Sequence, residues 1–128
     1  MNLLLDTCAL LALAAGSLPR AAREALEAGG DACISPVVVW EIAIKVKTGK
    51  LQLPTDPLAW AEALATRHSL NLDRHVPDIS VFCAAADLPL IHRDPFDRVV
   101  VATALQRGFT ILTSDRIIPT YPGVKVIW

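Results

Sequence analysis

Four acidic side chains, Asp6, Glu41, Asp97 and Asp115, stand at points where a parallel α/β fold would bring distant parts of the chain together. Asp6 ends the apolar run at residues 2–5, and Asp115 follows the run at residues 110–114. Ligand sites in such folds usually lie at the carboxyl ends of the strands. Because carboxylates without matching cations repel one another, such a cluster normally needs a hard divalent ion. The pattern therefore predicts a metal-dependent enzyme.

Each acid also has a simpler explanation. Asp6 can cap the helix that follows it, and Asp115 can form a capping turn. Glu41 lies four residues before Lys45, which is the spacing of an exposed ion pair on a helix. However, the segment around Glu41 is apolar on almost every side, and a charged residue in such surroundings needs a partner or a metal.

A second acid lies close to Asp97. Asp94 and Asp97 are three residues apart on one helix face near the helix N-terminus, where the helix dipole favours negative charge. That effect alone can explain Asp94, which we therefore treat as a secondary metal ligand. The histidines have no nucleophile pattern near them, so we expect surface or capping roles for them. They are His68, His75 and His92.

Composition bounds the class of protein. The 128 residues fit one domain, 1–128. The hydrophobic fraction is 53%, which can fill a sheet covered on both faces and can also leave apolar surface for a partner or a second copy. The net charge of −1 gives no sign of a general nucleic-acid binder. A charge this close to zero still leaves room for local basic patches.

The cysteines and the N-terminus indicate a cytoplasmic protein. Cys8, Cys33 and Cys83 have no metal-ligand spacing and are odd in number, so they are expected as free thiols in a reducing compartment. The apolar N-terminus has no basic residue ahead of it and is interrupted by Asp6, unlike a signal peptide. No stretch reaches the roughly 20 apolar residues of a membrane span.

Short apolar runs alternate with helical patterns along the chain. Strands are expected at residues 2–5, 32–34, 70–72, 110–113 and 124–127. Helices are expected at residues 7–15, 19–29, 36–47, 56–67, 75–86 and 93–106. Residues 36–47 are rich in β-branched side chains, so a strand is the alternative there, but apolar positions 37, 40 and 44 favour a helix. The alternation predicts an α/β fold with a mainly parallel sheet of four to five short strands.

Four segments, in this order, resemble those of PIN-domain proteins. They are Asp-Thr-Cys-Ala-Leu-Leu at 6–11, Val-Trp-Glu-Ile-Ala-Ile-Lys at 39–45, His-Arg-Asp-Pro-Phe-Asp-Arg at 92–98 and Leu-Thr-Ser-Asp at 112–115. Within that family the chain is similar to VapC-type toxins of bacterial or archaeal toxin–antitoxin pairs, and the similarity runs from residue 2 to residue 128. The single acids are weakly specific, whereas their order together with Arg-Asp-Pro-Phe-Asp-Arg is strongly specific.

The resemblance implies a three-layer PIN-like fold and a metal-dependent endoribonuclease. The family's acidic quartet matches Asp6, Glu41, Asp97 and Asp115, which would hold one or two Mg²⁺ or Mn²⁺ ions. It also implies an RNA substrate, a homodimer, and a small VapB-like antitoxin that blocks the active site.

Phosphodiester hydrolysis suggests a role for each of these residues. We expect Asp6 and Asp97 to contact the metal directly, and Asp115 and Glu41 to complete its shell or orient the attacking water. Hydroxyls near the strand end can bind that water or a phosphate oxygen, and basic side chains can contact RNA phosphates. The hydroxyls are those of Thr113 and Ser114, and the basic residues are Lys45, Arg98 and Arg116.

Three alternatives remain beside this reading. A Mg²⁺-dependent phosphatase of the haloacid-dehalogenase type needs a second aspartate two positions after the first, and Cys8 stands there. A receiver domain normally has adjacent acids after its first strand, where only Asp6 is present. The third alternative is a non-catalytic PIN-like interaction module whose acids serve as caps and ion pairs.

Overall fold

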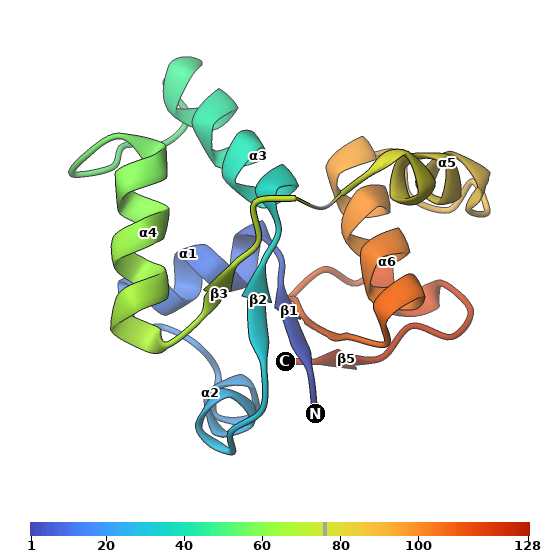
Figure 1. Cartoon of the computed structure of the whole chain (residues 1–128), viewed down its shortest axis with the longest axis horizontal. Helices are drawn as coiled ribbons and strands as arrows, with labels where there is room; N and C mark the ends of the chain where they lie inside the picture. Colours follow the sequence, from blue (N-terminus) through green and yellow to red (C-terminus); the bar gives the residue numbers. More distant parts are fainter. Residues whose placement is uncertain (76) are drawn as a thin grey trace.

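The computed structural model describes residues 1–75 and 77–128, and it forms an α/β fold built on one parallel sheet (Figure 1). The described strands are β1 (Leu3–Leu5), β2 (Ala32–Ile34), β3 (Asn71–Leu72), β4 (Thr110–Leu112) and β5 (Val126–Ile127). The described helices are α1 (Thr7–Ala15), α2 (Arg20–Glu27), α3 (Pro36–Lys47), α4 (Pro57–His68), α5 (Ile79–Asp87), α6 (Pro95–Arg107) and the short 3-10 helix η1 (Ile118–Thr120).

The sheet places β1 at its centre, in the order β3-β2-β1-β4-β5. Every strand pairing in the described residues is parallel, and Leu5 pairs with Ile34 on one side and Leu112 on the other. The ends of β1, β2 and β4 therefore lie at one edge of the sheet. In Figure 1, α3 and α4 stand to the left of this edge and α5 and α6 to the right.

The strands at the centre of the sheet are buried at every position. This burial explains their uninterrupted apolar sequences, because helices cover both faces of a parallel sheet. The strands supply the largest fully buried side chains, which also include Leu10, Val38, Ile42 and Val100 of the covering helices. The high hydrophobic fraction is thus largely used in this core.

Polar residues fix the helix starts that face the carboxyl edge. Asp6 caps α1, Ser35 caps α3, and Asp94 caps α6, each accepting a hydrogen bond from a backbone N–H of the first turn. Proline occupies the first position of α3 and of α6, where its missing N–H costs nothing. The caps at Asp6 and Asp94 fix the starts of α1 and α6, and with them the positions of Asp6 and Asp97 near the carboxyl ends of the strands.

The predicted elements are present, with shifts at their ends. The segment 36–47 is a helix rather than a strand. The helix expected over residues 75–86 begins only at Ile79, because Asp78 caps it there. Val76, which we placed in that helix, lies outside the described residues. The 3-10 helix η1, which follows Asp115, was not predicted.

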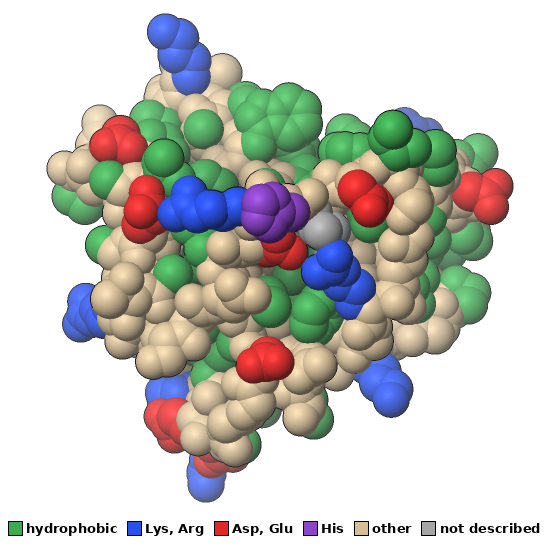
Figure 2. Space-filling model, viewed as in Figure 1, with side chains coloured by type: hydrophobic (Ala, Val, Ile, Leu, Met, Phe, Trp, Pro, Cys, Tyr) green, Lys and Arg blue, Asp and Glu red, His purple; other side chains and the backbone are tan. Residues whose placement is uncertain are grey.

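Hydrophobic side chains remain exposed on the face shown in Figure 2, over α3 and α5. The exposed large side chains of these two helices are Trp40, Ile44, Ile79 and Phe82. An apolar surface of this kind usually marks contact with another macromolecule. Among the described helices, none is long and apolar enough to cross a membrane.

Candidate metal centre

Asp6 is buried where β1 gives way to α1, and both of its carboxylate oxygens are occupied. Oδ1 accepts a hydrogen bond from the N–H of Ala9 at 2.9 Å, which caps α1. Oδ2 accepts a hydrogen bond from the hydroxyl of Thr113, just beyond β4. The carboxylate is therefore held rigidly between two neighbouring strands, as expected for a site at the sheet edge.

Asp115 follows β4 and turns the chain into η1. Its Oδ1 accepts hydrogen bonds from the N–H groups of Ile117 at 2.7 Å and Ile118 at 3.1 Å. Its own N–H donates to the hydroxyl oxygen of Thr113 at 3.0 Å. The capping turn considered for Asp115 is present, and it uses Oδ1. The other oxygen, Oδ2, lies within hydrogen-bond distance of Nε2 of His92.

Asp97 and Asp94 lie in and just before the first turn of α6 and play different parts. Asp94 is the N-cap, and its Oδ1 accepts a hydrogen bond from the N–H of Phe96 at 2.9 Å. Asp97, one turn on, points its Oδ2 toward the ring of His92 at 2.9 Å. The secondary place given to Asp94 therefore agrees with its use as a cap.

Glu41 reaches the cluster from α3. Its Oε1 accepts a hydrogen bond from the hydroxyl of Thr7 at 2.6 Å, and its Oε2 lies 3.7 Å from Nζ of Lys45. Both explanations of this residue hold at once, because the ion pair with Lys45 exists and a second polar partner comes from α1. Thr7 was considered from the sequence only as a possible helix cap, a place that Asp6 takes, and its contact with Glu41 was not predicted because it depends on helix packing.

The carboxylates repel one another strongly enough to alter their ionisation. Burial and the charge of Asp94 raise the pKa of Asp97 to about 7, although His92 lowers it. Burial also raises the pKa of Asp6, against the hydrogen bonds from Thr113 and Ala9 and with the charges of Asp115 and Glu41. The four predicted acids therefore act on one another's ionisation, and shared neighbours connect three of them: Thr113 connects Asp6 to Asp115, and His92 connects Asp115 to Asp97.

Asp115 differs from the other two acids in its ionisation. Burial acts to raise its pKa, but the hydrogen bonds from His92, Ile118 and Ile117 outweigh burial and hold the pKa below its ordinary value. Asp115 is therefore ionised when Asp97 is still partly protonated. If these residues held a divalent cation, Asp115 would supply an ionised carboxylate and Asp97 would have to release its proton.

The donor set fits a hard divalent ion. Carboxylate oxygens are the ligands of Mg²⁺ and Mn²⁺, and the excess of negative charge has only Lys45 and the His92 ring as nearby partners among the described residues. Among the described residues, Nε2 of His92, one oxygen of Asp97 and one oxygen of Asp115 lie within 4.8 Å of one another, and Asp6 and Glu41 are outside this group but act on it through their charge. The chemistry of these residues therefore agrees with the predicted cofactor.

His92 lies against two acids of the cluster, where sequence reasoning expected only a surface or capping role. Its Nε2 lies 2.9 Å from Oδ2 of Asp97 and 3.1 Å from Oδ2 of Asp115. The ring does meet the start of α6, because Nδ1 accepts the N–H of Asp94 at 3.1 Å, as a capping role predicts. The position of His92 just before the helix that carries Asp97 could have suggested its contact with Asp97. Its contact with Asp115 could not be predicted, because it depends on how the chain folds.

The predicted water- and phosphate-binding residues are placed differently from one another. Ser114 and Arg116 are exposed beside Asp115, whereas Thr113 is buried against Asp6. The guanidinium of Arg98 donates to the carbonyls of Ala85 at 2.8 Å and of Leu88 at 3.0 Å, at the end of α5. That guanidinium is engaged inside the protein, so Arg98 is poorly placed for an RNA phosphate.

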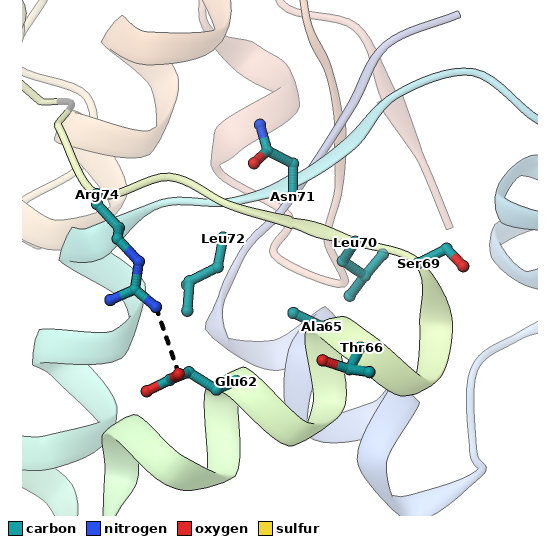
Figure 3. A pocket seen from close by; sticks show the side chains of 8 residues that line it. All are labelled: Glu62, Ala65, Thr66, Ser69, Leu70, Asn71, Leu72 and Arg74. Carbon is teal, nitrogen blue, oxygen red and sulfur yellow. Dashed lines mark ion pairs between the residues drawn. The ribbon is translucent and has the colours of Figure 1, made fainter.

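A separate open cavity of about 470 Å³ lies between α4 and β3 (Figure 3). The ion pair between Arg74 and Glu62, 3.4 Å apart, spans it. None of its lining residues belongs to the carboxylate cluster, and its charged groups neutralise each other. This cavity therefore offers no carboxylate cluster of the kind found at the carboxyl edge of the sheet.

Comparison with known sequences gives a family match and a similar protein. A family profile described as the PIN domain matches residues 3–124. Ribonuclease VapC22 of Mycobacterium tuberculosis (strain ATCC 25618 / H37Rv) is 28% identical over 118 residues, which cover 87% of this chain and 85% of that protein.

Solved structures share the fold over nearly the whole chain. VapBC2 from Rickettsia felis, bound to a DNA fragment from its promoter, matches with a TM-score of 0.71 and 16% identity, covering 99% of this chain and 98% of that one. DNA-bound VapBC from Salmonella typhimurium matches with a TM-score of 0.70 and 20% identity, covering 99% of this chain and 97% of that one. A toxin–antitoxin complex from Klebsiella pneumoniae matches with a TM-score of 0.58 and 24% identity, covering 98% of this chain and 95% of that one. At these identities the likeness establishes the fold.

Proposed function

Because the chain belongs to the PIN-domain family, we propose that it is a metal-dependent endoribonuclease that acts as the toxin of a toxin–antitoxin pair. The observation that supports the proposal is that Asp6, Asp115 and Asp97 are connected through Thr113 and His92 near the carboxyl ends of β1 and β4, with Glu41 reaching toward them from α3. The similarity to a protein named as a ribonuclease supports RNA as the substrate. Hydrolysis of a phosphodiester bond is the reaction class that such a site serves.

The proposed cofactor is one or two Mg²⁺ or Mn²⁺ ions. When bound, such ions neutralise charge on the phosphate and supply an activated water. Asp6 and Asp97 would hold the metal directly, while Asp115 and Glu41 would complete its shell or orient the water. Asp94 keeps the secondary place that the sequence suggests, and its Oδ1 caps α6.

The neighbours of these acids fix them for that task. The hydroxyl of Thr113 donates to Oδ2 of Asp6 and accepts the backbone N–H of Asp115, so it connects the carboxylate of Asp6 to the backbone of Asp115. Thr7 holds Oε1 of Glu41 in the same way. Such outer partners typically account for 10–100-fold in metal affinity or activity. These hydrogen bonds restrict the side chains of Asp6 and Glu41, so metal binding would order them at a smaller cost in entropy.

Contact with the RNA backbone would come from exposed polar residues around the acids. Arg116 and Ser114 lie beside Asp115 at the surface, and Lys45 lies beside Glu41. Positive side chains there would offset repulsion between the phosphates and the carboxylates. Arg98 serves the protein interior instead, through the carbonyls that end α5.

Protein partners are part of the proposal. The similar structures include VapBC proteins and a toxin–antitoxin complex, which supports a small VapB-like antitoxin as the inhibitor of this chain. The exposed hydrophobic residues of α3 and α5 would be covered by such a partner or by a second copy in a homodimer. A toxin that cleaves cellular RNA would act in the cytoplasm.

The direct test is RNA cleavage by the purified chain after the antitoxin has been removed. We expect cleavage of a panel of structured and single-stranded RNAs with Mg²⁺ or Mn²⁺, and none with EDTA. Asp6→Asn should abolish this cleavage. Asp56→Asn is its matched control, because Asp56 also caps a helix but lies at the start of α4, away from the cluster. If no RNA is cleaved with either metal, the non-catalytic interaction module becomes the better account.

A further inference from the structure

His92 stands inside the carboxylate cluster rather than beside it. The side chain is 13% exposed, and its Nε2 contacts one oxygen of Asp97 and one of Asp115 at 2.9 and 3.1 Å. Those are two oxygens that a bound divalent ion would need. The nitrogen therefore fills the position between two proposed ligands.

The hydrogen bond at the other ring nitrogen decides what His92 can do there. Nδ1 accepts the backbone N–H of Asp94 at 3.1 Å, so it carries no hydrogen of its own. In a neutral imidazole the hydrogen must then be on Nε2, which makes Nε2 a donor to the two carboxylates. This assignment follows from the partners of the ring. A nitrogen that donates has no lone pair for a metal.

The main chain of His92 is anchored from a second direction. Its N–H donates to the hydroxyl oxygen of Tyr121 at 2.8 Å, and Tyr121 is buried against the end of η1. Its carbonyl accepts a hydrogen bond from Arg98 at 3.4 Å. These contacts hold the backbone while leaving rotation about the side-chain bonds as the way for the ring to move.

We propose that His92 is a competitor of the metal: its Nε2–H joins Asp97 to Asp115 in the metal-free protein, and a divalent ion binds by displacing the ring. The inference deepens the proposed function and rests on its metal dependence. It gives the chain a way to keep the cluster ordered without metal, because a donor shared by two carboxylates reduces their repulsion.

The rival reading makes His92 a ligand. Nε2 and one oxygen of each acid lie within 4.8 Å of one another, close enough to surround one ion. Coordination through Nε2 would require the hydrogen on Nδ1, where it would point at the N–H of Asp94. The start of α6 would then have to change. The competitor and ligand readings predict opposite effects when the ring is removed.

The first test is calorimetric titration with Mn²⁺ at one fixed pH on the intact chain, on His92→Ala and on His68→Ala. We expect His92→Ala to bind Mn²⁺ about tenfold more tightly, a change of about 1.4 kcal/mol. His68, at the end of α4 near the opposite edge of the sheet, is the matched control and should leave the affinity unchanged. Equal or weaker binding by His92→Ala would overturn the proposal.

The second test needs no variant and therefore does not depend on how well one folds. In the ¹⁵N-labelled chain, long-range ¹H–¹⁵N spectra report which ring nitrogen of His92 carries the hydrogen. We expect Nε2 to carry it without metal and to keep it after Mg²⁺ is added, while the ring signals move. A hydrogen on Nδ1 in either state would contradict the competitor role.

Failure of this inference and failure of the proposed function give different results. Mn²⁺ binding that is the same with and without His92 removes the inference and leaves the metal site standing. Absence of Mn²⁺ binding by both the intact chain and His92→Ala removes metal dependence, and the inference with it. Tight Mn²⁺ binding without RNA cleavage removes only the endoribonuclease.

Discussion

The hydroxyl of Thr113 joins Asp6 to Asp115, donating to Oδ2 of Asp6 and accepting the N–H of Asp115. Asp6 and Thr113, which are 107 positions apart in the sequence, thus share one buried hydrogen bond. The bond exists because β1 and β4 are neighbours whose ends are in register. It ties the first acid of the cluster to the last.

Replacing Thr113 with Val keeps the shape of the side chain and removes this bond. We expect a loss of about 1–3 kcal/mol in the free energy of unfolding, because a buried carboxylate oxygen loses its donor. We also expect Mn²⁺ to bind about 10-fold more weakly, as is typical for an outer partner of a ligand. Denaturant unfolding and calorimetry measure the two effects.

Thr103→Val is the control for that substitution. Thr103 is also buried, but its hydroxyl bonds only to the carbonyl of Val99 within α6. Its replacement should leave Mn²⁺ affinity unchanged. If both valine variants alter metal binding equally, Thr113 has no special connection to the site.

The raised pKa of Asp97 makes the metal-free protein less stable as the pH increases. The native pKa is about 7, whereas in the unfolded chain it is about 3.9. Between these values the folded state holds one proton more than the unfolded state, so stability is lost as the pH rises through 7. Asp115 acts in the opposite direction, but its lowered pKa places that effect below about pH 4.

Asp97→Asn therefore raises the stability of the metal-free protein more at pH 8 than at pH 5, because most of the loss in the intact chain falls between these two pH values. We expect a gain in Tm of about 3–6 °C at pH 8, which corresponds to roughly 1 kcal/mol in a domain of this size. Thermal unfolding in EDTA at both pH values measures it. A Tm difference that does not change with pH would show that Asp97 is ionised normally.

Arg98 and Arg116 separate a structural arginine from a substrate-facing one. Arg98→Ala removes the guanidinium that donates to the carbonyls of Ala85 and Leu88 at the end of α5, so we expect a loss of roughly 2 kcal/mol in stability. Arg116→Ala removes an exposed charge and should weaken RNA binding with little change in stability. Unfolding and RNA-binding measurements on both variants test this contrast. The reverse pattern would restore Arg98 as the phosphate contact.

Much of the fold could be predicted because its signals are local. Buried strands have continuous apolar sequences, and the caps and prolines at Ser35 and Asp94 mark helix starts. The helix expected from His75 begins at Ile79, since apolar periodicity does not reveal which polar residue becomes the cap. The 3-10 helix after Asp115 has no periodic signal to find.

The candidate site was predictable only in part, for a physical reason. The acids could be located from strand ends and motif order, but their partners come from other elements. Thr7 meets Glu41 only when α1 packs against α3, and His92 meets Asp115 only when α6 lies beside β4. Arg98 lies within a motif that suggests RNA contact, yet packing turns its guanidinium toward α5.

The central claim is that the cluster hydrolyses RNA with the help of a divalent metal. The most direct test maps RNA 5′ and 3′ ends in cells that express the chain without an antitoxin, next to cells that express Asp6→Asn or Asp97→Asn. Asparagine can still cap α1 in place of Asp6, so the fold should survive that change. We predict new ends at defined positions with the intact chain and at least about 100-fold fewer with either variant. The same ends at the same frequency with both variants would contradict the claim.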